Sequence, residues 1–167
     1  MKKHTVIRLI CTFLLALTAL SCLASCGGGD WRDDVAVSSL DSAIQAKLPV
    51  PDGYYSPDSD YLEFYFEGAD AIVDEYTIQI SATSTNINQF GIFHVKDGEA
   101  ENMKKICQTY IETSKNRWVA QANYIASEHP KMEGAEIRVF GNYVVYTMLT
   151  TEDKATAFAT VEELLKK

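Results

Sequence analysis

The side chains best suited to catalysis or metal binding are thiols and imidazoles, and this sequence has few of them. Beyond residue 26 the chain has one cysteine, Cys107, and two histidines, His94 and His129. A zinc site usually needs three or four ligands at recognisable spacing, and the sequence has neither a CxxC nor an HExxH motif. Cys107 falls on the apolar stripe of an expected helix, where a buried thiol is a structural residue. We therefore predict no metal site and no catalytic residue.

Carboxylates are more numerous, and seven of them gather within eighteen residues: Asp58, Asp60, Glu63, Glu67, Asp70, Asp74 and Glu75. The segment Asp58-Ser59-Asp60 opens like a calcium-binding EF-hand loop. It continues as Tyr61-Leu62-Glu63, without the third ligand and the glycine that such a loop requires. We therefore expect a solvated acidic face and not a calcium site.

Aromatic side chains form a second group in the same region: Tyr54, Tyr55, Tyr61, Phe64, Tyr65 and Phe66. Exposed aromatic residues supply much of the energy of binding surfaces, so this group is a candidate partner surface. The alternative is that Tyr61, Phe64 and Tyr65 seat a short helix on the core. Tyr54 and Tyr55 fall in an expected loop, and we predict that they are the exposed, partner-binding pair.

The first 26 residues have a different character. A basic start with Lys2, Lys3 and Arg8 precedes the run 9–20, which is apolar apart from two threonines and is shorter than a membrane span of about 20 residues. This pattern predicts a signal peptide. The run is followed by Leu23-Ala24-Ser25-Cys26, which resembles the lipobox recognised by signal peptidase II in bacterial lipoproteins.

The lipobox resemblance implies that residues 1–25 are cleaved and that Cys26 receives a diacylglyceryl group, with Leu23, Ala24 and Ser25 as the peptidase recognition residues. Two acyl chains are sufficient for stable anchoring. Residues 26–32 would then be the lipidated cysteine and a glycine-rich tether. The expected location is the extracytoplasmic face of the bacterial cell membrane, with the membrane as partner through Cys26 and no other cofactor.

Removal of residues 1–25 takes three basic residues and no acidic residue, so the formal net charge falls from −8 to −11. So acidic a chain offers no basic patch for nucleic acid or anionic lipid. Residues 33–167 are long enough for one domain with its own core. Because Cys107 is the single remaining thiol, that domain has no internal disulfide and depends on packing.

Hydrophobic periodicity and turn residues predict the elements of this domain. We expect helices over residues 33–48, 61–66, 99–129 and 150–165. We expect hairpins from strands 71–82 with 90–95, and 137–140 with 143–149. The predicted fold class is α+β: a mostly antiparallel, four-stranded sheet of two hairpins, covered on one face by the long central helix and the C-terminal helix, with an N-terminal helix.

Three segments resemble a known family: Gln89-Phe90-Gly91-Ile92-Phe93 leading into Lys96-Asp97, the lone Tyr124, and Gly141-Asn142-Tyr143-Val144-Val145. The family consists of small Firmicute lipoproteins catalogued as domain of unknown function 4358. It has no characterised active site, so the resemblance implies no catalytic residue.

Two functional hypotheses follow. In the first, the chain is not an enzyme but a membrane-anchored binding or accessory module that contacts an envelope protein or a cell-wall component. In the second, it is an envelope hydrolase or other enzyme whose site, drawn from His94, Cys107 and the acidic residues, forms only in three dimensions.

Overall fold

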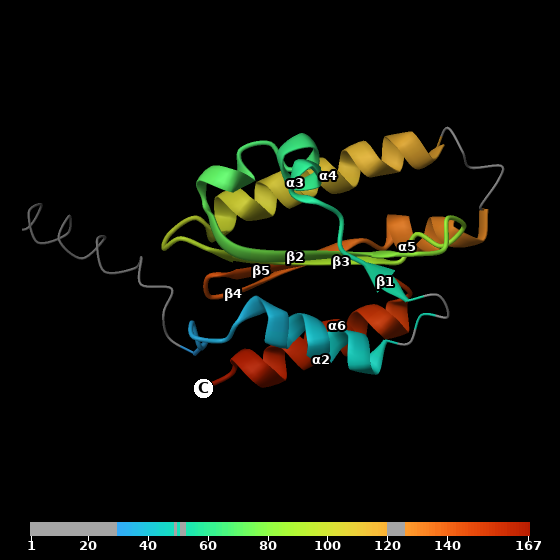
Figure 1. Ribbon diagram of the computed structural model, residues 1–167. Helices are drawn as coiled ribbons and strands as arrows, with labels where there is room; N and C mark the ends of the chain where they lie inside the picture. The colour runs from blue at the N-terminus through green and yellow to red at the C-terminus, as the bar shows by residue number, and fades with distance from the viewer. Residues whose placement is uncertain (1–29, 49, 51–52, 120–125) are drawn as a thin grey trace, which may run out of the picture. The chain divides into compact units, whose positions relative to one another are not determined.

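A five-stranded antiparallel sheet lies at the centre of the unit Trp31–Lys167, in the order β1-β2-β3-β5-β4 (Figure 1). The computed structural model describes residues 30–48, 50, 53–119 and 126–167. The strands are β1 (Tyr54–Tyr55), β2 (Val73–Ser81), β3 (Gln89–Val95), β4 (Glu136–Phe140) and β5 (Tyr143–Met148). The helices are α2 (Val37–Lys47), α3 (Ser59–Tyr65), η2 (Ala69–Ala71), α4 (Ala100–Val119), η3 (Ala126–Glu128), α5 (His129–Glu133) and α6 (Thr151–Leu165).

The predicted α+β class and both hairpins are confirmed, but the sheet has a fifth strand. The two hairpins join through β3 and β5, where Gly91 lies opposite Tyr146. The additional strand, β1, pairs Tyr54 with Ser81 at the edge of the sheet. Sequence reasoning missed β1 because it is two residues long and lies in a proline-rich segment that is typical of a loop.

Helices cover both faces of the sheet, so the prediction of one covered face is wrong. Figure 1 shows α3 and α4 on one side of the sheet and α2 and α6 on the other. The cause is visible in β3, where Gln89, Gly91 and Phe93 face α4 while Phe90 and Ile92 face α2 and α6. Side chains alternate along a strand, so a strand with large apolar residues on both sides needs cover on both.

Capping explains where two helices begin. The sequence allows Thr150 or Thr151 as the cap of α6, and the structure has Thr150, whose Oγ accepts a hydrogen bond from Asp153 N at 3.1 Å. Helix α2 starts at Val37, later than expected, and no side chain of its own segment caps it. Instead Val37 N donates to the Glu75 carboxylate of β2 at 3.0 Å. A cap from a distant strand cannot be read from local sequence.

Helix α4 ends at Val119 in the described chain, whereas a continuous helix to residue 129 was expected. Residues 120–125, including Tyr124, lie outside the described residues. Residues 126–133 form η3 and α5 instead. Within the described ranges, no helix is both long enough and apolar enough to cross a membrane.

Candidate functional site

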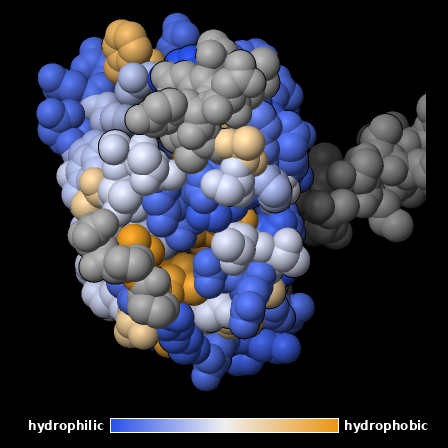
Figure 2. All heavy atoms as spheres, turned by 90° about the vertical axis from the view of Figure 1, so that its right-hand side faces the viewer, coloured by the Kyte–Doolittle hydropathy of each residue, from blue (hydrophilic) through white to orange (hydrophobic). Residues whose placement is uncertain are grey.

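A pocket of about 350 Å³ lies between α3, α4 and the loop that joins β2 to β3. Figure 2 faces the end of the molecule that contains this loop, and hydrophilic residues cover most of the surface in that view. We call this site the tyrosine pocket. It is lined by Tyr55, Tyr61, Ile80, Ser81, Thr83, Ser84, Asn86, Ile87, Gln89, Tyr110, Ser114, Arg117 and Met148.

The Gln89 carboxamide organises the floor of the tyrosine pocket. Its Nε2 donates to the hydroxyl oxygens of Tyr110, at 2.7 Å, and Tyr146, at 2.6 Å. The Tyr110 hydroxyl donates in turn to Gln89 Oε1 at 3.0 Å, and the Tyr61 hydroxyl lies 2.7 Å from that of Tyr110. Strand β3, strand β5 and helices α3 and α4 are thus tied together through one amide. Such a network fixes the rotamers of the side chains that form the floor.

Gly91 makes this arrangement possible. It lies directly opposite Tyr146 in the β3–β5 ladder, and a Cβ atom at position 91 would lie 2.2 Å from Tyr146 Cε1. The Tyr146 ring therefore occupies the space that a side chain at position 91 would fill. A glycine inside an apolar strand commonly marks such a close approach.

The tyrosines of the floor are neutral hydroxyl groups near neutral pH. Burial raises the pKa of Tyr61, Tyr110 and Tyr146 above the ordinary tyrosine value of 10.0. The neighbouring hydroxyls of Tyr110 and Tyr61 add to this rise in the pKa of Tyr146. Tyr61 and Tyr110 line the pocket and offer hydrogen bonds to a ligand, while the fully buried Tyr146 supports them from below. None of the three acts as a base near neutral pH.

Arg117 lies at the rim, in the last turn of α4. Its guanidinium carbon is 4.6 Å from the centre of the Tyr65 ring, and Nη2 donates to Ser114 Oγ at 3.3 Å. Among the described residues that line the pocket, Arg117 alone is charged. The other described arginines, Arg32 and Arg138, pair with carboxylates, whereas Arg117 has no ion pair within the described part of the chain.

Glu128 and Lys131 hold the outer loop of the pocket in place. The Glu128 carboxylate accepts hydrogen bonds from Ile87 N at 3.1 Å and from Lys131 Nζ at 2.6 Å. Lys131 also donates to Asn86 Oδ1 at 3.2 Å. Lys131 is therefore paired with the Glu128 carboxylate, and its positive charge is not available to a ligand in the pocket.

The predicted partner pair, Tyr54 and Tyr55, is divided by the structure. The Tyr55 side chain is 50 % exposed and lines the tyrosine pocket. Tyr54 faces the other side of the sheet, where its ring meets the edge of Phe90 with centroids 5.4 Å apart. Its hydroxyl is buried, and burial raises its pKa to about 12. The prediction that Tyr54 is exposed is wrong, because β1 turns successive side chains to opposite faces.

Phe64 on α3 is the most exposed large apolar residue described, at 79 %, while Leu62 and Phe66 seat this helix on the core. Two wider hollows, of about 860 and 740 Å³, flank Phe64. The larger is lined by residues of the single segment 58–70 and includes five of the carboxylates of the acidic cluster. The tyrosine pocket draws its walls from more elements than either hollow, since β1, β2, β3, β5, α3 and α4 all contribute.

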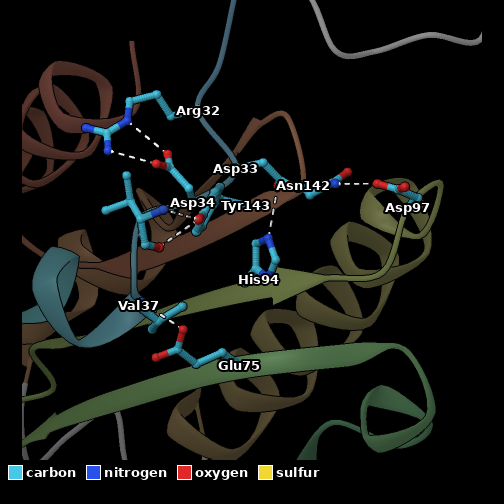
Figure 3. Close-up of polar contacts among 10 residues, drawn as sticks. Arg32, Asp33, Asp34, Val37, Glu75, His94, Asp97, Asn142 and Tyr143 are labelled. Carbon is cyan, nitrogen blue, oxygen red and sulfur yellow. Dashed lines mark hydrogen bonds and ion pairs between the residues drawn. The ribbon is translucent and has the colours of Figure 1, made fainter. Parts of the chain in front are cut away.

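Two residues of the enzyme hypothesis, His94 and Cys107, lie on opposite faces of the sheet. Cys107 lies on the buried side of α4, where it is fully enclosed by the core, and this burial raises the pKa of its thiol. His94 lies on the opposite face of the sheet, where its Nε2 is 3.0 Å from Asp33 Oδ1 and its ring packs on Tyr143 (Figure 3). In the described part of the chain, no group of three or more His, Cys, Asp or Glu residues could hold a metal ion.

The contacts in Figure 3 attach the start of the domain to the end of the sheet far from the pocket. The Tyr143 hydroxyl donates to Val35 O at 2.6 Å and accepts from Val35 N at 3.1 Å. Arg32 N donates to Leu165 O at 2.7 Å, beside the bridge between Trp31 and Lys166. We call this region the tether end. The signal-peptide and lipobox residues, including Cys26, lie outside the described residues.

Sequence reasoning missed Gln89, Tyr146 and Arg117 as site residues. Gln89 and Tyr146 belong to strands that were predicted, yet they are 57 positions apart and meet only through the β3–β5 pairing. Two sequence features could have pointed to them: a glutamine that opens an apolar strand, and Gly91 within it.

The fold and the pocket define an α+β domain with a sheet buried between helices and a ligand-sized recess at the end of that sheet. The family model described as Domain of unknown function (DUF4358) matches residues 56–149, which is more than half of the chain. The chain therefore belongs to this family, as the resemblance implied. No curated protein and no solved structure matches the chain. All the lining residues of the tyrosine pocket except Tyr55 fall within the matched range.

Proposed function

We propose that the protein is a lipid-anchored, non-catalytic binding module at the extracytoplasmic face of a bacterial cell membrane. In this proposal residues 1–25 direct export, and Cys26 carries the diacylglyceryl anchor. The module binds a small molecule of the envelope or of the cell wall, or serves as the accessory subunit of an envelope protein. The resemblance of Leu23-Ala24-Ser25-Cys26 to a lipobox supports the anchor.

The observation that carries this proposal is the position of the tyrosine pocket relative to the start of the domain. In the β3–β5 ladder, Gln89 pairs with Met148 at the pocket, and His94 pairs with Tyr143 at the tether end. Five strand steps separate Gln89 from His94, or about 17 Å. The five residues 26–30 also reach at most about 17 Å. An anchor on Cys26 would therefore keep the start of the domain near the membrane, while the pocket lies about 17 Å further along the sheet.

The chemistry of the pocket favours binding over bond cleavage. Its floor presents protonated tyrosine hydroxyls and a carboxamide, and its rim presents one guanidinium group. None of these three groups, the tyrosine hydroxyl, the carboxamide and the guanidinium, is a base or a nucleophile near neutral pH. Cys107, the one thiol in the domain, is enclosed by apolar side chains and does not line the pocket.

The anchor is tested by growing cells that express the full chain with labelled palmitate, beside a Cys26→Ser variant. We expect label on the wild-type protein in the membrane fraction and none on the variant, which should also keep its signal peptide. Equal labelling of both proteins, or no labelling of either, would refute anchoring through Cys26.

Binding is tested by isolating the full-length protein from membranes in mild detergent and measuring its mass under native conditions. We expect a small molecule to accompany the wild-type protein. Ser114→Trp, which fills the pocket, should lose that molecule, and the neighbouring exposed variant Thr113→Trp should keep it. An adduct that persists in Ser114→Trp would place the ligand elsewhere. Absence of any adduct from the wild-type protein would count against the binding function.

A further inference from the structure

We propose that the tyrosine pocket binds an acidic sugar, meaning a single hydroxylated ring that carries one carboxylate. This inference rests on the proposed binding function and gives the ligand its chemical class. It depends on three properties of the pocket: its volume, the Arg117 guanidinium at its rim, which has no carboxylate partner among the described residues, and the neutral polar groups of its walls.

The volume limits the size of the ligand. About 350 Å³ is close to the lower end of small-molecule sites, which span roughly 300–1,000 Å³. A monosaccharide fits such a space, whereas a folded peptide does not. A longer glycan could place only its terminal ring inside.

Arg117 selects the charge of the ligand. Arg32 and Arg138 have carboxylate partners at 3.0 and 2.8 Å, while Arg117 contacts a serine hydroxyl and the face of the Tyr65 ring. One N–H group of the guanidinium donates to Ser114 in the described structure, and its remaining N–H groups could serve a ligand. A guanidinium edge matches a carboxylate in a two-bond geometry. In a chain with 23 acidic and 15 basic residues, a guanidinium without a carboxylate partner in the described structure is notable.

The walls suit the hydroxylated body of a sugar. Ser81 ends β2, and Ser84 and Asn86 belong to the β2–β3 loop. Their hydroxyl and amide groups both donate and accept hydrogen bonds. The half-exposed ring of Tyr55 offers a flat apolar surface for the C–H face of a sugar ring. No carboxylate is found among the described lining residues, so the site offers nothing to balance a cationic ligand.

The ligand class is tested by calorimetric titration of the purified full-length protein in detergent with two matched pairs of probes. Glucuronate is compared with glucose, and N-acetylmuramate with N-acetylglucosamine. Each pair shares a ring, and one member of each pair carries a carboxylate. We expect the acid to bind about tenfold or more tightly than its neutral partner, because a hydrogen bond between charged groups is stronger than a neutral one.

Arg117→Met should abolish this preference for the acid, and Arg117→Lys should retain part of it because the charge remains without the planar fork. Arg32→Met is the matched control, since it removes an exposed arginine at the tether end. Thermal unfolding of each variant shows whether the fold is intact. Loss of binding by an unfolded Arg117→Met would not count in favour; the Arg117→Lys result would then decide.

Two results would overturn the acidic-sugar assignment while leaving the binding function intact. The first is equal affinity for the acid and the neutral sugar, or an acid affinity that Arg117→Met and Arg117→Lys leave unchanged. The second is saturation of the site by acetate or inorganic phosphate with the affinity of the acidic sugars, which would indicate a simple anion site. If no probe binds but a Ser114-dependent adduct is found, the ligand class is wrong. If neither is found, both proposals fail.

Discussion

The two faces of the central sheet receive side chains from the same strands, and each buries an apolar cluster, but the α3 and α4 face also carries the tyrosine network. On the α2 and α6 face, Phe90, Ile92 and Val145 meet Phe158, and all four are fully buried apolar residues. On the α3 and α4 face, the neighbouring position in β3 is Gln89, whose carboxamide links tyrosines of two elements.

This difference separates stability from recognition. An apolar layer gains free energy in proportion to the surface that it buries, and it tolerates several packing arrangements. A buried polar network is stable only when its members find partners, so it selects one arrangement of hydroxyl groups. Both faces bury an apolar cluster that holds the sheet. The α3 and α4 face, which we call the polar face, adds the tyrosine network that supports the pocket, and we call the α2 and α6 face the apolar face.

The largest expected effect comes from opening the apolar face. Phe158→Ala should lower the free energy of unfolding by about 3–5 kcal/mol, since it leaves a cavity among fully buried side chains. Urea unfolding measures this change. The control Phe64→Ala removes a 79 % exposed ring from α3 and should change the free energy of unfolding by less than about 0.5 kcal/mol. Similar losses of unfolding free energy in the two variants would contradict a buried Phe158 ring and an exposed Phe64 ring.

The next effect comes from the polar face. Gly91→Ala should destabilise the protein by about 1–3 kcal/mol, because the new methyl group collides with the Tyr146 ring. If that collision is the cause, Tyr146→Leu should relieve it, and the double variant should lose less free energy than the sum of the two single variants. Strict additivity would mean that Gly91 is required for another reason.

Removal of the amide gives a smaller loss. Gln89→Leu should cost about 1–2 kcal/mol, since the hydroxyls of Tyr110 and Tyr146 lose their partner while the leucine adds apolar contact. Urea unfolding is again the measurement, with Gln108→Leu on the exposed side of α4 as the control. If Gln89→Leu leaves the free energy of unfolding unchanged, the network fixes the arrangement of the side chains without adding stability.

Much of the fold was accessible from the sequence. Alternation and turn residues predicted β2 to β5, and helical spacing predicted α2, α4 and α6. The fifth strand and the second covered face were missed. The apolar run from Tyr143 indicated a central strand, but the strand pattern alone does not say on which side each helix packs.

The candidate site was much less accessible. Cys107 was correctly expected to be buried, because it lies on the apolar stripe of a helix. The network of Gln89, Tyr110 and Tyr146 depends on the register between β3 and β5 and on where α4 crosses them, and neither is a local property. The Val37 cap is similar, since its acceptor, Glu75, lies on another element.

The smallest effect at neutral pH is expected for Tyr146→Phe, at about 0.5–1.5 kcal/mol for one hydrogen bond. Its main consequence is at high pH. Folding raises the pKa of Tyr146 above 10.0, so the folded state favours the protonated hydroxyl, and the stability linked to this group is complete below pH 10 and lost as the pH rises above it. The wild-type protein should therefore lose stability more steeply than Tyr146→Phe above pH 10. Unfolding by urea across that range, with phenolate absorbance recorded in parallel, measures both slopes. Equal slopes would mean that Tyr146 ionises without unfolding, and that the polar face is open to water.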